Sequence, residues 1–245
     1  MQLPLDLIAV PEPRLTDGVP GRNAQALAAL AQVIDPSRRG FASLLLWGNP
    51  GAGKTFWLKA WVAQAGQRAI YVDCGPVVAA DAKTSGARHT LWDRVLGDRS
   101  VADPVVWCLD NVDQADADTV NRLFQLYNVA REAGLCCVAT ASAPPLRMTL
   151  RDDLRTRLGQ SLIFELHELD DEEKKNALRE RAEQLACPLP EDLLQYLMTR
   201  LPRDLGRLMG VLQALNDYAL SRQRAVTIPL LKEFLDTSNA NTRTV

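Results

Sequence analysis

The chain has 245 residues, of which 47% are hydrophobic and 24% are charged, so it has enough apolar material for a full globular core. Its 28 basic and 30 acidic residues leave a formal net charge of -2. A chain so close to neutrality has no bulk electrostatic attraction for a polyanion, and this excludes nucleic acid as the default partner.

Cysteine usage and the N-terminus indicate the cellular compartment. The five cysteines lie in or beside apolar segments, and their odd number without metal-ligand spacing disfavours a disulfide framework or a zinc site. We expect reduced core residues at Cys74, Cys108, Cys136, Cys137 and Cys187. The N-terminus lacks a basic signal segment, and no apolar run approaches the ~18 residues that a membrane span needs. The sequence therefore predicts a soluble, cytoplasmic protein with no membrane partner.

The first two thirds of the chain alternate between short apolar runs and helical patterns. After an extended, proline-containing tail over 1–17, we expect a helix over 23–34. Strands buried on both faces are predicted over 41–47, 69–73, 105–110, 135–141 and 161–166, and further helices over 54–65, 90–96 and 117–133. This alternation predicts one α/β domain over 18–166, with a five-stranded parallel sheet flanked by helices.

The pattern changes after Leu166, beyond which only helices are predicted. Asp170 and Pro190 are typical helix starts, and prolines follow two of the predicted ends. The predicted helices cover 171–186, 191–200, 204–222 and 228–235. We therefore expect an all-helical second domain over 167–238 and a polar tail over 239–245.

An unbroken GxxxxGK[ST] motif follows the first predicted strand and precedes a helix, which is the context of a phosphate-binding P-loop. Its residues are Gly48, Asn49, Pro50, Gly51, Ala52, Gly53, Lys54 and Thr55. The glycines let backbone N–H groups and the helix N-terminus face the phosphates of ADP or ATP. Lys54 is expected to neutralise the β- and γ-phosphate oxygens, and Thr55 to bind Mg²⁺.

A P-loop needs a carboxylate on a neighbouring strand to hold the magnesium shell, and Asp110 closes the apolar run VVWCLD. The next residue is Asn111, which cannot accept a proton from the attacking water, so we expect slow intrinsic hydrolysis. Asp113 is a candidate substitute, although a turn or helix N-cap explains it equally well. Thr140 or Ser142, at the end of the next strand, is a candidate phosphate sensor, with Thr140 preferred; a satisfied core hydroxyl is the alternative.

Two arginines have positions that suit nucleotide chemistry. Arg157 precedes the last predicted strand, where it suits an arginine finger acting on a partner's nucleotide. Arg203 begins a helix of the second domain, where it suits a sensor of the chain's own nucleotide. Spacing alone does not distinguish either arginine from a solvated surface residue.

From Val19 to about Leu235 the chain resembles the AAA+ core of the bacterial replication initiator DnaA. The shared features are the GxxxxGKT loop, the LDN motif, the T-x-S strand end, the R-x-R-L segment, a helical domain with R-D-L, and a final TIPLLKEFL helix. The resemblance implies a P-loop AAA+ core followed by a helical lid. It also implies that Arg157 is a finger and Arg203 a lid sensor.

Two departures from the initiator point to a more specific family. The chain stops at Val245 without the helix-turn-helix domain, so we expect no direct sequence-specific DNA binding. The N-terminal QLPLDL is similar to peptides that dock on the β sliding clamp of DNA polymerase III. Its anchoring side chains would be Gln2, Leu3, Leu5 and Leu7. A clamp peptide joined to a DnaA-like core resembles the Hda family, the regulatory inactivators of DnaA.

That resemblance implies a negative regulator of replication initiation, with DnaA and the clamp as partners. ADP or ATP with Mg²⁺ would be bound, and the protein would activate hydrolysis by DnaA more than it hydrolyses ATP itself. A DnaC-like helicase loader is the alternative, with the same core but a helicase-binding N-terminus. A small-molecule P-loop kinase is a second alternative, disfavoured by the helical last third. The bound nucleotide and a homodimeric state stay open.

Overall fold

The computed structural model describes residues 12–35, 37–76, 106–201 and 204–241. They form two compact units, Pro13–Glu168 and a second unit that begins at Leu169. The predicted helix over 90–96 lies outside the described residues. None of the described helices combines the length and apolar character required to cross a membrane.

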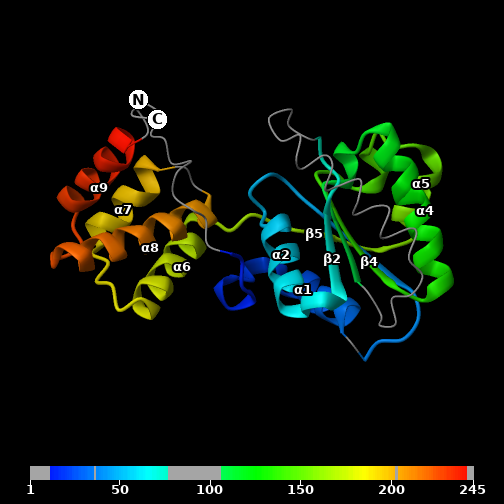
Figure 1. The fold of residues 1–245 in the computed structure, drawn as a ribbon, viewed down its shortest axis with the longest axis horizontal. Helices are drawn as coiled ribbons and strands as arrows, with labels where there is room; N and C mark the ends of the chain where they lie inside the picture. The colour runs from blue at the N-terminus through cyan, green and yellow to red at the C-terminus, as the bar shows by residue number, and fades with distance from the viewer. Residues whose placement is uncertain (1–11, 36, 77–105, 202–203, 242–245) are drawn as a thin grey trace. The chain divides into compact units, whose positions relative to one another are not determined.

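The first unit is built on a parallel sheet, whose five described strands lie in the order β2-β3-β4-β1-β5 (Figure 1). The strands are β1 (Ala42–Trp47), β2 (Ala69–Asp73), β3 (Val106–Asp110), β4 (Cys136–Ala141) and β5 (Leu162–Glu165). All pairings between neighbouring strands are parallel. The prediction of a five-stranded parallel sheet is confirmed for the described residues.

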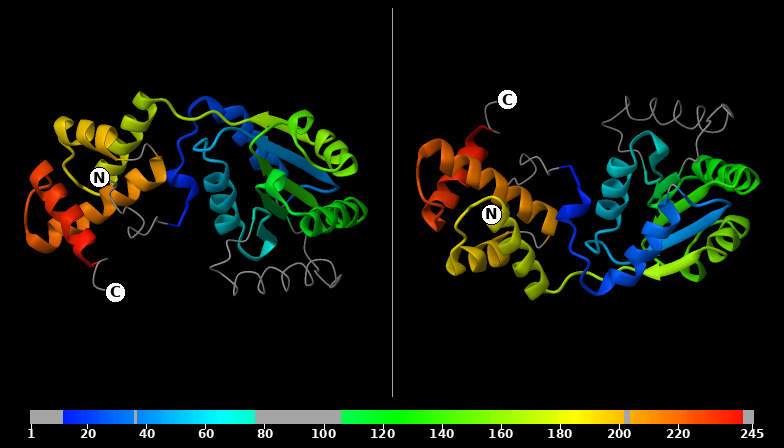
Figure 2. Two further views of the ribbon diagram at one scale, coloured as in Figure 1. Left: turned by 90° about the horizontal axis from the view of Figure 1, so that it is seen from above. Right: turned by 90° about the horizontal axis from the view of Figure 1, so that it is seen from below.

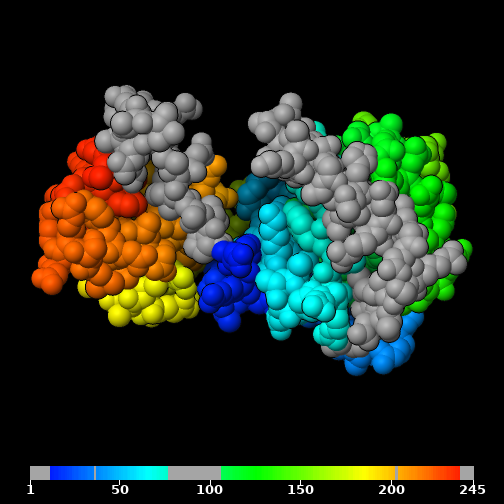
Figure 3. Space-filling view, in the orientation of Figure 1, coloured from blue at the N-terminus to red at the C-terminus, as the bar shows by residue number. Residues whose placement is uncertain are grey.

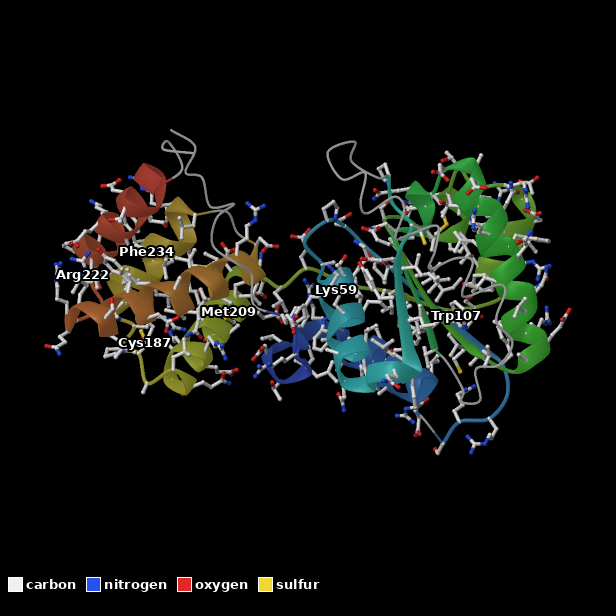
Figure 4. The ribbon with its side chains drawn as sticks, in the orientation of Figure 1. Lys59, Trp107, Cys187, Met209, Arg222 and Phe234 are labelled. Carbon is white, nitrogen blue, oxygen red and sulfur yellow. The ribbon has the colours of Figure 1, made fainter. Side chains whose placement is uncertain are left out.

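Helices cover both faces of this sheet (Figures 1 and 2). The helices are α1 (Ala24–Ile34), α2 (Lys54–Ala65), α4 (Ala117–Ala133) and α5 (Asp152–Gly159). Successive residues of β1 face opposite sides of the sheet. Leu44 and Leu46 pack with α1 and α2, whereas Leu45 packs with α4 and α5. Because side chains alternate across a strand, a run buried on both faces reads as continuously apolar. Figure 4 shows Trp107 of β3, which belongs to the cluster with α4.

The helix α4 has clear signals at both ends. Asp116 is its N-cap and accepts a hydrogen bond from the Thr119 N–H, while Gly134 ends the helix in a left-handed conformation. Asp113 is therefore not the N-cap of α4. It lies instead in the short 3₁₀ helix η5 (Val112–Gln114), between β3 and α4.

One part of the strand prediction is wrong. The run over 161–166 was expected to be buried on both faces, but in β5 Leu162 is 54% exposed and Ile163 is 39% exposed. Within the described residues, β5 pairs only with β1 and forms an edge of the sheet. Apolar composition alone does not distinguish an edge strand from a central one.

The second unit is helical, as predicted. Its helices are α6 (Asp171–Gln184), α7 (Glu191–Arg200), α8 (Leu205–Arg222) and α9 (Ile228–Asn241). Asp170 and Glu173 form a reciprocal capping box at the start of α6. Leucines from all four helices form its core, which also contains Cys187 (Figure 4). In Figure 3, the orange and red residues of α8 and α9 make up much of the visible face of this unit. The last helix continues beyond its predicted end at Leu235.

Candidate nucleotide-binding site

The GxxxxGK[ST] motif lies between β1 and α2, in the strand–loop–helix context that its sequence predicted. Gly51 and Gly53 have φ angles of 88° and 83°, which only glycine adopts without strain. Gly53 is also the N-cap of α2, so the loop ends where the free N–H groups of the helix begin. This backbone forms a cradle suited to phosphate.

Gly48 is required for a different reason, because it begins the loop in close contact with the chain after β5. The N–H of Gly48 donates to the Ala141 carbonyl at 3.2 Å, and the N–H of Leu166 donates to the Trp47 carbonyl at 2.7 Å. A Cβ atom at Gly48 would lie 2.3 Å from the Leu166 carbonyl oxygen. The Leu166 carbonyl belongs to the backbone, so a change of side-chain rotamer cannot make room for a Cβ atom at Gly48.

We expect Gly48→Ala to lower the free energy of unfolding by about 1–3 kcal/mol, because the overlap forces backbone atoms apart. The same shift would displace the phosphate loop and weaken nucleotide binding. Gly159→Ala is the matched control, since a Cβ there meets nothing within 4 Å. Denaturant unfolding of the two variants tests this. Equal stability of both would show that the Gly48 contact is not restrictive.

Lys54 extends from the start of α2 back over the loop. Its Nζ donates hydrogen bonds to the carbonyls of Gly48 at 2.7 Å and Asn49 at 2.9 Å. Partial burial lowers its pKa from the ordinary value, and this is partly offset by the carboxylates of Asp110, Asp113 and Glu168. The ammonium is therefore held at the loop, next to the cradle.

Asp110 is fully buried at the end of β3 and receives hydrogen bonds from three hydroxyl groups. Thr55 Oγ1 donates to its Oδ2 at 2.7 Å, and the Tyr71 hydroxyl donates to the same oxygen at 2.9 Å. Thr140 Oγ1 donates to Oδ1. The P-loop threonine and the strand carboxylate that the sequence predicted are thus brought together.

This arrangement fits a magnesium ion. The proton of the Thr55 hydroxyl is directed to Asp110, which leaves the Oγ1 lone pairs for a cation. Oxygen ligands are those that Mg²⁺ prefers, and water molecules complete its shell. Thr55 would therefore bind the ion directly, while Asp110 would hold its water molecules.

Tyr71 is a further site residue, and it was not predicted from the sequence. It lies in β2, the strand next to β3, and burial followed by the charge of Asp110 raises its pKa well above the ordinary value. It consequently stays a hydrogen-bond donor near neutral pH. In the sequence, Tyr71 is visible only as a tyrosine within a strand-forming run. The strand order is needed to show that its hydroxyl reaches Asp110.

Polar residues at the ends of β3 and β4 form two further pairs. Thr140 Oγ1 accepts from the Asn111 N–H at 3.0 Å, in addition to its bond to Asp110. The N–H of Ser142 donates to Asp113 Oδ2 at 2.9 Å. Thr140 is buried and engaged with Asp110, whereas Ser142 is exposed and engaged with Asp113.

The predicted finger is carried by a different element from these groups. Arg157 is on α5, and its guanidinium stacks on the ring of Phe124 of α4, with 4.3 Å between Cζ and the ring centroid. Arg203 and the clamp-peptide residues Gln2, Leu3, Leu5 and Leu7 lie outside the described residues.

Comparison with known proteins agrees with this geometry. Residues 44–166 match the model of the "ATPase family associated with various cellular activities (AAA)", and residues 171–235 match the family "Hda, lid domain". The first match spans the sheet and the P-loop site, and the second spans most of the helical unit.

Solved structures show the same fold. Domain III of the Thermotoga maritima replication initiation protein DnaA is 23% identical, with a TM-score of 0.64, and the alignment covers 92% of this chain and 98% of that chain. AMPPCP-bound DnaA from Aquifex aeolicus is 18% identical, with a TM-score of 0.61 and coverages of 89% and 70%. The Thermotoga maritima RuvB branch migration motor is 14% identical, with a TM-score of 0.60 and coverages of 94% and 73%.

The AAA match covers the strands and the P-loop, and the lid match covers the helices that follow them. The chain therefore belongs to the AAA family of ATPases; its helical unit is similar to the lid domain of Hda, and its fold is similar to that of DnaA domain III.

Proposed function

We propose that this protein is a negative regulator of chromosome replication initiation that stimulates hydrolysis of the ATP bound to DnaA. In this proposal it binds ADP or ATP with Mg²⁺ at its own P-loop and docks on the β sliding clamp through Gln2, Leu3, Leu5 and Leu7. Arg157 then reaches the γ-phosphate held by DnaA and stabilises the negative charge that develops on hydrolysis. The Hda-type lid supports this function over that of a helicase loader.

The proposal depends on a difference in ion pairing between Arg157 and the neighbouring arginines. Arg151 donates to Asp153 at 2.7 Å, and Arg155 donates to Asp152 at 2.7 Å. Arg157, on the same short helix, has no carboxylate within ion-pair distance in the part of the chain that the structure describes. Phe124 supports the guanidinium without neutralising it, so its donors are available to a partner's phosphate.

In this proposal, the nucleotide bound at the P-loop mainly orders this protein's own core. The P-loop backbone, Lys54 and the Thr55–Asp110 pair would hold the phosphates and the ion, and Arg203 would act from the lid. The AMPPCP-bound DnaA structures, which share this fold, support binding of a nucleotide by this protein. Whether the working form contains ADP or ATP is decided by measuring activity after loading each nucleotide.

The proposal is tested by following ATP hydrolysis on DnaA with this protein, clamp and DNA each present or omitted. We expect fast hydrolysis only when all three are present, because clamp loaded on DNA concentrates the regulator through its N-terminal peptide. Replacing Gln2, Leu3 and Leu5 with alanine should remove the dependence on the clamp together with the stimulation. Full stimulation by that variant would contradict clamp docking, and stimulation of helicase loading instead would favour the loader.

A further inference from the structure

The residue after Asp110 is turned away from the phosphate loop. Asn111 has φ and ψ angles of 57° and 44°, in the left-handed region. Its side-chain Nδ2 donates to Asp73 Oδ1 of β2 at 3.1 Å. In the sheet, β2 lies on the side of β3 opposite to β4 and β1. Asn111 therefore faces away from the strand that carries the P-loop, and its amide cannot accept a proton.

Asp113 is directed toward the opposite side, to the end of β4. Its Oδ2 accepts hydrogen bonds from the N–H and the hydroxyl of Ser142. The preceding residue, Ala141, accepts the N–H of Gly48 through its carbonyl at 3.2 Å. The Asp113 carboxylate is thus anchored one residue away from the contact at which the P-loop begins. Its charge also acts on the Lys54 ammonium.

The second carboxylate oxygen is left without a partner. Asp113 Oδ1 is buried, and no donor lies within hydrogen-bond distance in the described part of the chain. A buried acceptor without a donor is unfavourable in a folded protein, so a ligand or a water molecule is expected to complete it. The alternative role as a helix N-cap belongs to Asp116. The two Ser142 donors hold the Asp113 carboxylate at the end of β4 through its other oxygen, Oδ2.

We propose that this protein hydrolyses ATP at its own P-loop, with Asp113 accepting the proton of the attacking water. The inference rests on the proposed nucleotide binding and is independent of any action on DnaA. The water oxygen forms a bond to the γ-phosphorus, and the bond between that phosphorus and the β–γ bridging oxygen breaks. ADP and inorganic phosphate are released, and the proton passes to Asp113 Oδ1 and then to solvent. The carboxylate that Asn111 cannot supply is supplied two residues further along.

The test is single-turnover hydrolysis of radiolabelled ATP by the full-length protein, without DnaA or clamp. We expect Asp113→Asn to slow release of phosphate by about 10²–10⁴-fold, because the amide keeps its acceptor oxygen for Ser142 but presents an NH₂ group in place of Oδ1. Asp118→Asn is the matched control. Asp118 is an exposed carboxylate on α4 that pairs with Arg122, so this variant should hydrolyse ATP at the unmodified rate.

Binding measurements separate catalysis from a structural role. Asp113→Asn should bind ADP with unchanged affinity but bind ADP with aluminium fluoride, a mimic of the transferring phosphoryl group, more weakly than the unmodified protein. A parallel loss of ADP affinity would overturn the inference, as would equal hydrolysis by Asp113→Asn and the unmodified protein. Absence of turnover in unmodified protein that binds ATP would also overturn it. The proposed regulatory function is tested by a different assay, hydrolysis of ATP bound to DnaA. Failure of that function is therefore distinguishable from failure of the Asp113 inference.

Discussion

Replacing Arg157 with alanine is expected to abolish the stimulation of ATP hydrolysis on DnaA, with a loss of about 10³–10⁵-fold in the stimulated rate. A finger stabilises charge that is present only in the transition state, so its removal lowers the rate without weakening docking. The variant should keep its fold, because Arg157 contributes only a stacking contact with Phe124 among the described interactions. The measurement is single-turnover hydrolysis of DnaA-bound ATP with clamp and DNA present.

The structure offers close controls for this experiment. Arg155 lies two residues away on the same helix and is paired with Asp152, so Arg155→Ala should retain most of the stimulation. Arg157→Lys keeps the charge but loses the planar fork that matches phosphate, and should recover only part of the rate. Clamp binding, measured by pull-down, should be equal in all three variants. Stimulation that survives in Arg157→Ala would show that another group supplies the finger.

Lys54→Ala should weaken nucleotide binding by about 10²-fold or more, since charge-assisted hydrogen bonds to phosphate contribute about 1.5–3 kcal/mol each. In the structure the Lys54 ammonium already lies at the loop, bonded to the carbonyls of Gly48 and Asn49. Little rearrangement is needed to bring it to a phosphate oxygen. Titration with a fluorescent ADP analogue measures the effect. Arg68→Ala, at an exposed arginine shortly after the same helix, is the control and should bind normally.

The lowered pKa of Lys54 adds a dependence on pH. Phosphate binds the charged ammonium, so affinity is full while Lys54 is protonated and falls as the pH rises through its pKa. Because burial lowers that pKa, the decline should begin at a lower pH than for an ordinary lysine. Titrations from about pH 7 to about pH 10 test this. Lys54→Arg should flatten the profile, since arginine stays charged, and an unchanged slope would assign the dependence to another group.

The class of fold and the phosphate loop are predictable from the amino-acid sequence alone. Both depend on short-range patterns: apolar runs alternate with helical periods, and the loop residues from Gly48 to Thr55 are consecutive in the chain. Helix boundaries such as the capping box at Asp170 and Glu173 are equally local. Asp110 was also identified, because a carboxylate at the end of a buried strand has few other uses.

Which side chains meet across the sheet depends on the order of the strands, which the sequence pattern does not specify. The order β2-β3-β4-β1-β5 brings Tyr71 to Asp110 and places β5, with its exposed Leu162 and Ile163, at an edge of the described sheet, and neither result is encoded in a local pattern. The directions of the Asn111 and Asp113 side chains likewise depend on backbone geometry. The left-handed turn at Asn111 sends its amide to Asp73, and η5 sends Asp113 to Ser142. Such contacts depend on strand order and on single backbone angles, which residue spacing does not specify.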